Sequence, residues 1–268
     1  MSDKITPIPI AKNPDDLKDQ FEALVEIIRI LRKECPWDSK QSIESIAHLM
    51  IEEAYETIDA IHNKDYEGLS KELGDLLLHI IMHSVMAEEN GYFNLMDVIK
   101  RIQEKLIFRH PHVFGGLKVS GEEEVVENWE NLKKKEGKNS ALDGVPTTLP
   151  SLLRAERIQH KASRVGFDWQ KKDDVWLKVE EEILELKNAL LENKIADKTE
   201  EIGDLLFSLV NACRFEGVVA EESLQLTNNK FIKRFQYIEE KAKQINKKLS
   251  DMTLEEMDAI WDEAKKIV

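Results

Sequence analysis

Two short acidic motifs contain the residues best suited to chemistry. Residues 181–185 read EEILE, an EExxE motif, and residues 201–204 read EIGD, an ExxD motif. Residues three apart on a helix share one face, so each motif would present a pair of carboxylates if both segments are helical. Two neighbouring antiparallel helices would then bring four carboxylates together: Glu182, Glu185, Glu201 and Asp204.

Four clustered carboxylates would repel one another strongly in a half-buried site. A divalent cation removes this repulsion. The donor set holds only oxygen atoms, without His or Cys, which favours a hard ion such as Mg²⁺, with Mn²⁺ as a substitute. The spacing therefore predicts a magnesium site.

The same two motifs occur a second time, 129 residues upstream. Residues 52–56 read EEAYE and residues 72–75 read ELGD, and Glu-x-Gly-Asp-Leu-Leu is present in both copies. A repeat of this length indicates a duplicated domain. The upstream copy predicts a second metal site with the ligands Glu53, Glu56, Glu72 and Asp75.

The segments around these motifs show the apolar spacing of helices, and no stretch sustains the alternation of a strand. We therefore expect an all-α protein. Residues 137–150 are rich in Gly, Pro, Ser and Thr and read as a linker, which predicts domains at 1–136 and 151–268. In the first half, helices are expected from residue 14 to 35, through the EExxE motif to about 62 with Ser39 or Ser42 as N-cap, through the ExxD motif to about 89, over 95–109 and over 122–135, with a loop over 110–121. In the second half, they are expected over 151–164 and 173–192, through the ExxD motif to about 216, over 220–248 and after Thr253.

Composition excludes several classes of partner. The 268 residues carry a net charge of −14, which argues against binding to nucleic acid or to an anionic membrane surface. No apolar run reaches the length of a membrane span, and the N-terminus lacks the apolar core of a signal peptide. The two cysteines, Cys35 and Cys213, suit reduced thiols. We therefore expect a cytoplasmic protein.

Lysine and arginine recur four residues apart downstream of each acidic pair, as Lys105 with Arg109 and Lys230 with Arg234. On a helix such residues share a face. Arg can bind phosphate oxygens through two hydrogen bonds, and Lys supplies a point charge. A tryptophan near the end of each half can stack on a base. These features predict a nucleotide polyphosphate as ligand, with Trp129 and Trp261 near its base.

Taken together, these residues resemble the MazG family of nucleoside triphosphate pyrophosphohydrolases, within the all-α NTP pyrophosphatase superfamily. The resemblance extends from about residue 15 to the end of the chain. It implies two duplicated helical domains, each a four- to five-helix bundle with a carboxylate-bearing helical hairpin. The matching segments are Cys35–Asp38, both acidic pairs, Arg109–Phe114, Val165–Trp169 and Asn229–Phe235.

The resemblance implies Mg²⁺-dependent hydrolysis of NTPs and dNTPs to the monophosphate and pyrophosphate, with broad base specificity and a homodimer. The C-terminal domain is expected to be the main catalytic one, although the N-terminal quartet is intact. Glu181 is the candidate general base because it is the acid not assigned to the metal. The implied roles are metal binding and catalysis for Glu182 and Glu185, metal binding for Glu201 and Asp204, and nucleotide binding for Lys178, Lys230, Arg234, Trp261 and, in the first half, Lys105, Arg109 and Trp129.

Each feature also has a simpler interpretation. A single EExxE motif is usually a solvated helix face, and a helical tryptophan is often a core residue. A carboxylate-bridged di-metal oxidoreductase would also place its ligands on facing helices. Such sites contain a Glu-x-x-His motif, however, and none of the EExxE and ExxD motifs in this sequence contains His. A helical module that binds nucleotide only for regulation is a further alternative, especially for the N-terminal half.

Overall fold

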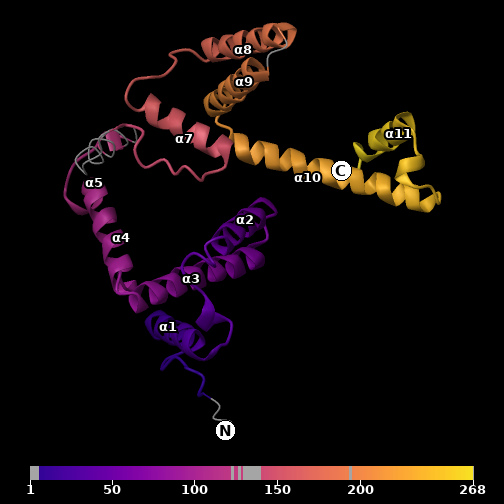
Figure 1. Cartoon of the computed structure of the whole chain (residues 1–268). Helices are drawn as coiled ribbons and strands as arrows, with labels where there is room; N and C mark the ends of the chain where they lie inside the picture. Colours follow the sequence, from indigo (N-terminus) through magenta and orange to yellow (C-terminus); the bar gives the residue numbers. More distant parts are fainter. Residues whose placement is uncertain (1–5, 122–123, 126–127, 129–139, 193–194, 268) are drawn as a thin grey trace. The chain divides into compact units, whose positions relative to one another are not determined.

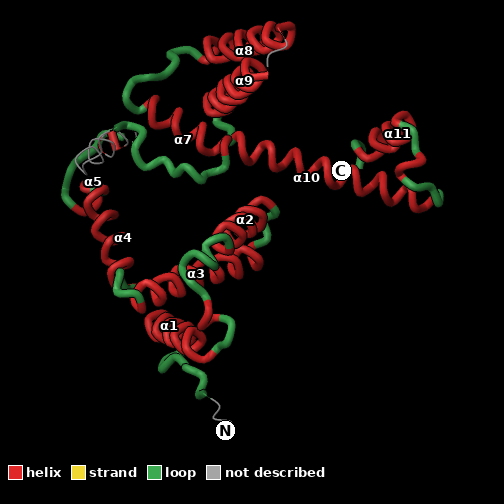
Figure 2. The backbone as a smooth tube through the Cα atoms, in the orientation of Figure 1, coloured by secondary structure: helices red, strands yellow, loops and turns green. Residues whose placement is uncertain are grey.

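The computed structural model describes residues 6–121, 124–125, 128, 140–192 and 195–267. All regular secondary structure within these ranges is helical (Figure 2), which confirms the predicted fold class. The chain divides into two compact units, Met1–Val119 and Ser120–Val268. No helix within the described ranges is long and apolar enough to cross a membrane. Trp129 and most of the helix expected over 122–135 lie outside the described residues.

A helical hairpin carries the acidic motifs of the first unit. After α2, the chain turns at Lys64, which has a φ of 54°, and the side chain of Asp65 caps α3 by accepting a hydrogen bond from the amide of Gly68. The short turn makes the two helices antiparallel neighbours, as Figure 1 shows. The elements of this unit are α1 (Leu17–Glu34), η1 (Asp38–Lys40), α2 (Leu49–His62), α3 (Tyr66–Glu89), α4 (Leu95–Arg109) and α5 (Pro111–Phe114).

The core of the first unit lies between α1, α3 and the segment that precedes α2. Ile28 and Ile81 are almost completely buried there, and Met82, Val85 and Met86 add a continuous apolar face of α3. Packing of this face against α1 excludes water from the side of α3 that follows the ExxD motif.

Three local predictions were wrong. Ser39 lies in η1, and Ser42 and Ser45 hydrogen-bond to each other, so α2 begins only at Leu49 without a serine cap. The predicted loop over 110–121 contains α5, because proline is favourable at the first position of a helix. The helix expected to reach Lys248 ends at Gln244, because Asn246 adopts a φ of 53° that no helix continues through.

The second unit repeats the hairpin with α8 and α9, which pack closely against each other (Figure 1). α7 packs on α9, and α10 contacts both of them. α11 folds back on α10, and a capping box between Thr253 and Glu256 begins this last helix. The elements are α7 (Ser151–Ser163), α8 (Lys172–Glu192), α9 (Ile195–Phe215), α10 (Ala220–Gln244), η2 (Leu249–Asp251) and α11 (Leu254–Ala264).

Candidate functional site

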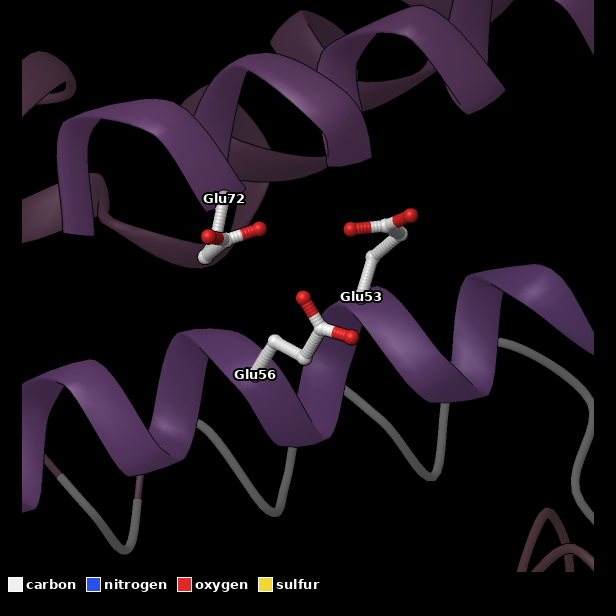
Figure 3. Close-up of side chains that lie close together, drawn as sticks. All are labelled: Glu53, Glu56 and Glu72. Atoms are coloured by element: carbon white, nitrogen blue, oxygen red, sulfur yellow. The ribbon is translucent and has the colours of Figure 1, made fainter. Parts of the chain in front are cut away.

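Three carboxylates of the first unit converge between α2 and α3. Figure 3 shows Glu53 and Glu56 on α2 pointing toward Glu72 on α3. One oxygen atom from each of the three lies within 4.8 Å of the others. Glu56 is exposed and Glu53 is half-buried, whereas Glu72 is only 8% exposed. Three members of the predicted quartet are therefore brought together on one face of the hairpin.

Burial and the repulsion between the carboxylates of this cluster both change the pKa of Glu53. Burial, followed by the charges of Asp75, Glu56 and Glu72, raises the pKa of Glu53. Asp75 lies outside the group of three, but its charge acts on Glu53. Lys71 Nζ lies 3.0 Å from Glu72 Oε1, while Glu72 Oε2 is buried with no hydrogen-bond partner in the described part of the chain. An oxygen atom in this situation is suited to a cation.

The second unit builds the same kind of cluster from Glu182 and Glu185 on α8 and Glu201 on α9. Their oxygen atoms again lie within 4.8 Å of one another. Glu182 is 5% exposed, and its Oε2 has no partner among the residues that the structure describes. Asp204 is not one of the three, but it lines the adjacent cavity together with Glu182.

Lys178 compensates part of this negative charge. Its Nζ lies 2.6 Å from Glu182 Oε1 and 2.9 Å from Glu181 Oε1, and these two contacts raise the pKa of Lys178 well above its usual value. Burial and then the charges of Glu185, Glu182, Asp204 and Glu200 raise the pKa of Glu201. One lysine does not neutralise the cluster, and its all-oxygen donors fit a hard divalent ion.

A cavity of about 750 Å³ adjoins the second cluster. This volume lies within the range of small-molecule sites. Most of the lining residues were not predicted from the sequence, although Asn211 follows Asp204 at position i+7 on the same face of α9. The lining residues are Leu142, Ile158, Gln159, Ala162, Gly166, Phe167, Asp168, Trp169, Lys178, Glu182, Asp204, Phe207, Ser208, Asn211 and Arg214.

The predicted phosphate and base contacts lie elsewhere in the fold. On α10 and α11, the Arg234 guanidinium lies 5.7 Å from the centre of the Trp261 ring, which in turn lies 5.0 Å from the Phe231 ring. Lys230 is exposed on α10. None of the three predicted residues Lys230, Arg234 and Trp261 is among the described residues that line the cavity. On α4, Lys105 is exposed and Arg109 is half-buried.

Comparison with known proteins identifies the repeated unit. The model of the MazG nucleotide pyrophosphohydrolase domain matches residues 41–114 and 170–238. Each matched range contains one complete set of acidic motifs and one of the carboxylate clusters described above.

Relatives match over nearly the whole chain. The "Nucleoside triphosphate pyrophosphohydrolase/pyrophosphatase MazG" of Thermotoga maritima is 41% identical over 91% of this chain and 95% of its own length. The "Nucleoside triphosphate pyrophosphohydrolase" of Escherichia coli K12 is 38% identical over 92% of this chain and 98% of its own. "Uncharacterized protein YabN" of Bacillus subtilis is 46% identical over 96% of this chain, which spans only 54% of that relative.

The domain match covers both acidic hairpins, and the relatives align with both units from end to end. The resemblance seen in the sequence is thereby confirmed. The chain belongs to the MazG family of nucleotide pyrophosphohydrolases, whose members act on phosphoric anhydride bonds.

Proposed function

We propose that this chain hydrolyses nucleoside and deoxynucleoside triphosphates to the monophosphate and pyrophosphate, and that its C-terminal half performs the reaction in the cytoplasm. One observation supports the choice of half. The carboxylate cluster of Glu182, Glu185 and Glu201 adjoins a cavity large enough for a nucleotide, because Glu182 and Asp204 form part of the cavity wall.

We assign Mg²⁺ to this cluster, with Mn²⁺ able to replace it. Glu182, Glu185, Glu201 and Asp204 would hold the ion, and the unpartnered Oε2 of Glu182 supports this assignment. When bound, a divalent ion supplies positive charge to the phosphates and acidifies water for attack on phosphorus.

Two side chains beside the cluster are assigned to the reaction. Lys178 contacts Glu182 and Glu181 and lines the cavity, so its ammonium group can shift toward a phosphate oxygen and stabilise the negative charge there. Glu181 is more exposed than Glu182, which leaves its carboxylate accessible to accept a proton from the attacking water.

We also propose a homodimer. α10 exposes the apolar side chains of Leu224, Leu226, Phe231 and Ile232, and burial of such side chains favours association in water. α10 and α11 also carry Lys230, Arg234 and Trp261, which we assign to binding of the nucleotide and which a dimer would bring to a carboxylate cluster. Sedimentation of the full chain tests the dimer; a monomer at micromolar concentration would contradict it.

The reaction is tested by pyrophosphate release from a panel of NTPs and dNTPs with Mg²⁺. Glu182→Gln keeps the shape of the side chain but removes the buried charge, so kcat should fall by about 10²–10³-fold. Glu180→Gln is the matched control, because Glu180 is exposed on the same helix. Far-UV circular dichroism verifies that both variants fold.

Chelation by EDTA should abolish turnover, and added Mg²⁺ or Mn²⁺ should restore it. No pyrophosphate release by the wild type from any triphosphate would refute the proposed function. A near-normal rate for Glu182→Gln would refute the assignment of the site.

A further inference from the structure

We infer that the cavity in the second unit is the nucleoside pocket of the enzyme and that Gln159 and Asn211 bind the edge of the base. This inference rests on the proposed function. It adds to that function a pocket and two residues that bind the part of the substrate away from the reacting phosphate.

One face of α9 connects the cluster with the far part of the pocket. Asp204, Phe207, Ser208 and Asn211 follow one another at the spacing of a single helix face, and all four line the cavity. At a rise of about 1.5 Å per residue, the seven steps from Asp204 to Asn211 span about 10 Å. This length is comparable with the distance from the α-phosphate of a nucleotide to its base.

Gln159 contributes a buried acceptor to this wall. The side chain is 7% exposed, and its Nε2 donates a hydrogen bond of 2.8 Å to the carbonyl oxygen of Phe207. A carbonyl oxygen can only accept, so the orientation of the amide is determined and Oε1 lies on the other side. This Oε1 is buried and has no hydrogen-bond partner in the described part of the chain. A buried acceptor without a protein partner can accept a hydrogen bond from a ligand or from a water molecule.

Asn211 contributes the complementary donor. Its Oδ1 accepts hydrogen bonds from Nε and an Nη atom of Arg214, at 3.0 and 2.8 Å. A guanidinium group can only donate, so the amide is again oriented and Nδ2 points away from Arg214. The pocket therefore presents one amide acceptor and one amide donor, on α7 and α9.

Arg214 also holds a loop that lines the cavity. It forms a two-pronged ion pair with Asp168, with one N···O distance of 2.9 Å, and so attaches the 165–169 loop to α9. That loop carries Phe167 and Trp169, which line the cavity and are both exposed. Aromatic rings there can stack on any base.

The pair of amides explains which bases would be accepted. Adenine and cytosine present an amino donor beside a ring-nitrogen acceptor, and guanine and uracil present a ring N–H beside a carbonyl. Each of them can satisfy Gln159 and Asn211 at once. The pocket should therefore accept all ordinary bases and reject a base that lacks the donor.

The experiment compares ATP with purine riboside triphosphate, which lacks the amino group of adenine. The wild type should show a kcat/KM about tenfold lower for the analogue, because Gln159 Oε1 would remain buried without a donor. In Gln159→Met, which is close in size and has no acceptor, kcat/KM for ATP should fall to that of the analogue. Gln103→Met, at an exposed position on α4, is the matched control and should behave as the wild type.

Calorimetric binding of AMP provides a readout that needs no turnover. AMP affinity should fall about tenfold in Gln159→Met and by a similar factor in Asn211→Leu, which tests the donor with an independent variant. Equal losses for ATP and the analogue in Gln159→Met, or no discrimination by the wild type, would overturn the inference. If the wild type releases no pyrophosphate but AMP binding still depends on Gln159, the proposed reaction is wrong and the pocket is right.

Discussion

The two halves of this chain keep the same carboxylate cluster but differ in what lies behind it. The repeat of 129 residues aligns their helices position by position. In the second half, Lys178, Ser208, Asn211 and Arg214 line a cavity. The corresponding residues of the first half are Leu49, His79, Met82 and Val85. Three of these four are apolar, and Met82 and Val85 belong to the buried core of their unit.

A cation site and a nucleotide pocket are two separate properties, and the acidic motifs account only for the first. The EExxE and ExxD motifs assemble a cation site in each half, because they require only two neighbouring helices. A nucleotide pocket also requires that the next two turns of the second helix remain polar and unfilled. We therefore propose that the first half retains a cation site without a nucleoside pocket.

The compensating lysine also differs between the halves. In the first half, Lys71 precedes Glu72 on α3, the second helix of the hairpin. In the second half, Lys178 lies one turn before Glu182 on α8, the first helix. Lys178 also lines the cavity of the second unit, which agrees with our assignment of the chemistry to the second half.

The largest effect should come from removing one exposed carboxylate from each cluster. Glu185 and Glu56 occupy equivalent positions and are both exposed, so Glu185→Ala and Glu56→Ala form a matched pair. We expect Glu185→Ala to lower kcat for pyrophosphate release by about 10²–10³-fold, because a cation ligand of the catalytic site is lost. Glu56→Ala should leave kcat nearly unchanged.

Binding of Mn²⁺ to the same variants sharpens this test. Each substitution should reduce the amount of Mn²⁺ bound per chain, because each removes a ligand from a different cluster. A large loss of turnover in Glu56→Ala would show that both halves catalyse, and the proposed division of labour would be wrong.

A second pair of matched variants compares the packed core of the first unit with the cavity of the second. Met82 is 6% exposed in an apolar core, so Met82→Ala should lower the free energy of unfolding of the first unit by about 2–5 kcal/mol. Asn211→Ala, at the equivalent position, removes hydrogen bonds to Arg214 but faces a cavity, so the cost should be about 1 kcal/mol. Urea unfolding followed by hydrogen exchange of α3 and α9 measures both. Equal costs would indicate that the two spaces are packed alike.

The smallest effect concerns pH. Burial, and then the neighbouring His83, lowers the pKa of His79 below its ordinary value of 6.5, although Asp75 acts in the opposite direction. The unfolded chain therefore binds a proton near pH 6.5 that the folded first unit does not bind. The stabilisation is complete above pH 6.5 and is lost as the pH falls below that value.

Urea unfolding at pH 7.5 and 5.5 measures this loss, and His79→Gln should reduce it. His160 is the matched control in the second unit. Burial and then the charge of Arg214 lower its pKa as well, but its side chain is 44% exposed and lies 3.6 Å from Glu156. Solvent screening should therefore make the effect of His160→Gln smaller. An equal effect of the two variants would contradict the expected role of burial.

Local sequence was sufficient for much of the fold. Apolar spacing placed α1, α3 and α4 close to their observed bounds, because helical periodicity is encoded within short windows. The beginning of α2 was missed because Ser42 and Ser45 form a turn with each other instead of capping a helix. The spacing of the motifs was sufficient to predict that three carboxylates meet in each half. It did not predict that Asp75 and Asp204 lie outside these groups of three.

By itself the sequence determined an all-helical, duplicated chain with two carboxylate clusters. Helical periodicity and the spacing of the acidic motifs both depend on residues that are only a few positions apart. Only the tertiary structure decided that α9 borders a cavity of about 750 Å³, whereas the matching part of α3 is packed into a core. Gln159 and Phe207 are 48 residues apart, and their contact depends on how α7 packs on α9. In the first half, Met82 and Val85 stand at the positions of Asn211 and Arg214, and they pack with Ile28 in a buried core. Whether side chains from distant helices fill a space depends on their combined shape, which no short window of sequence contains.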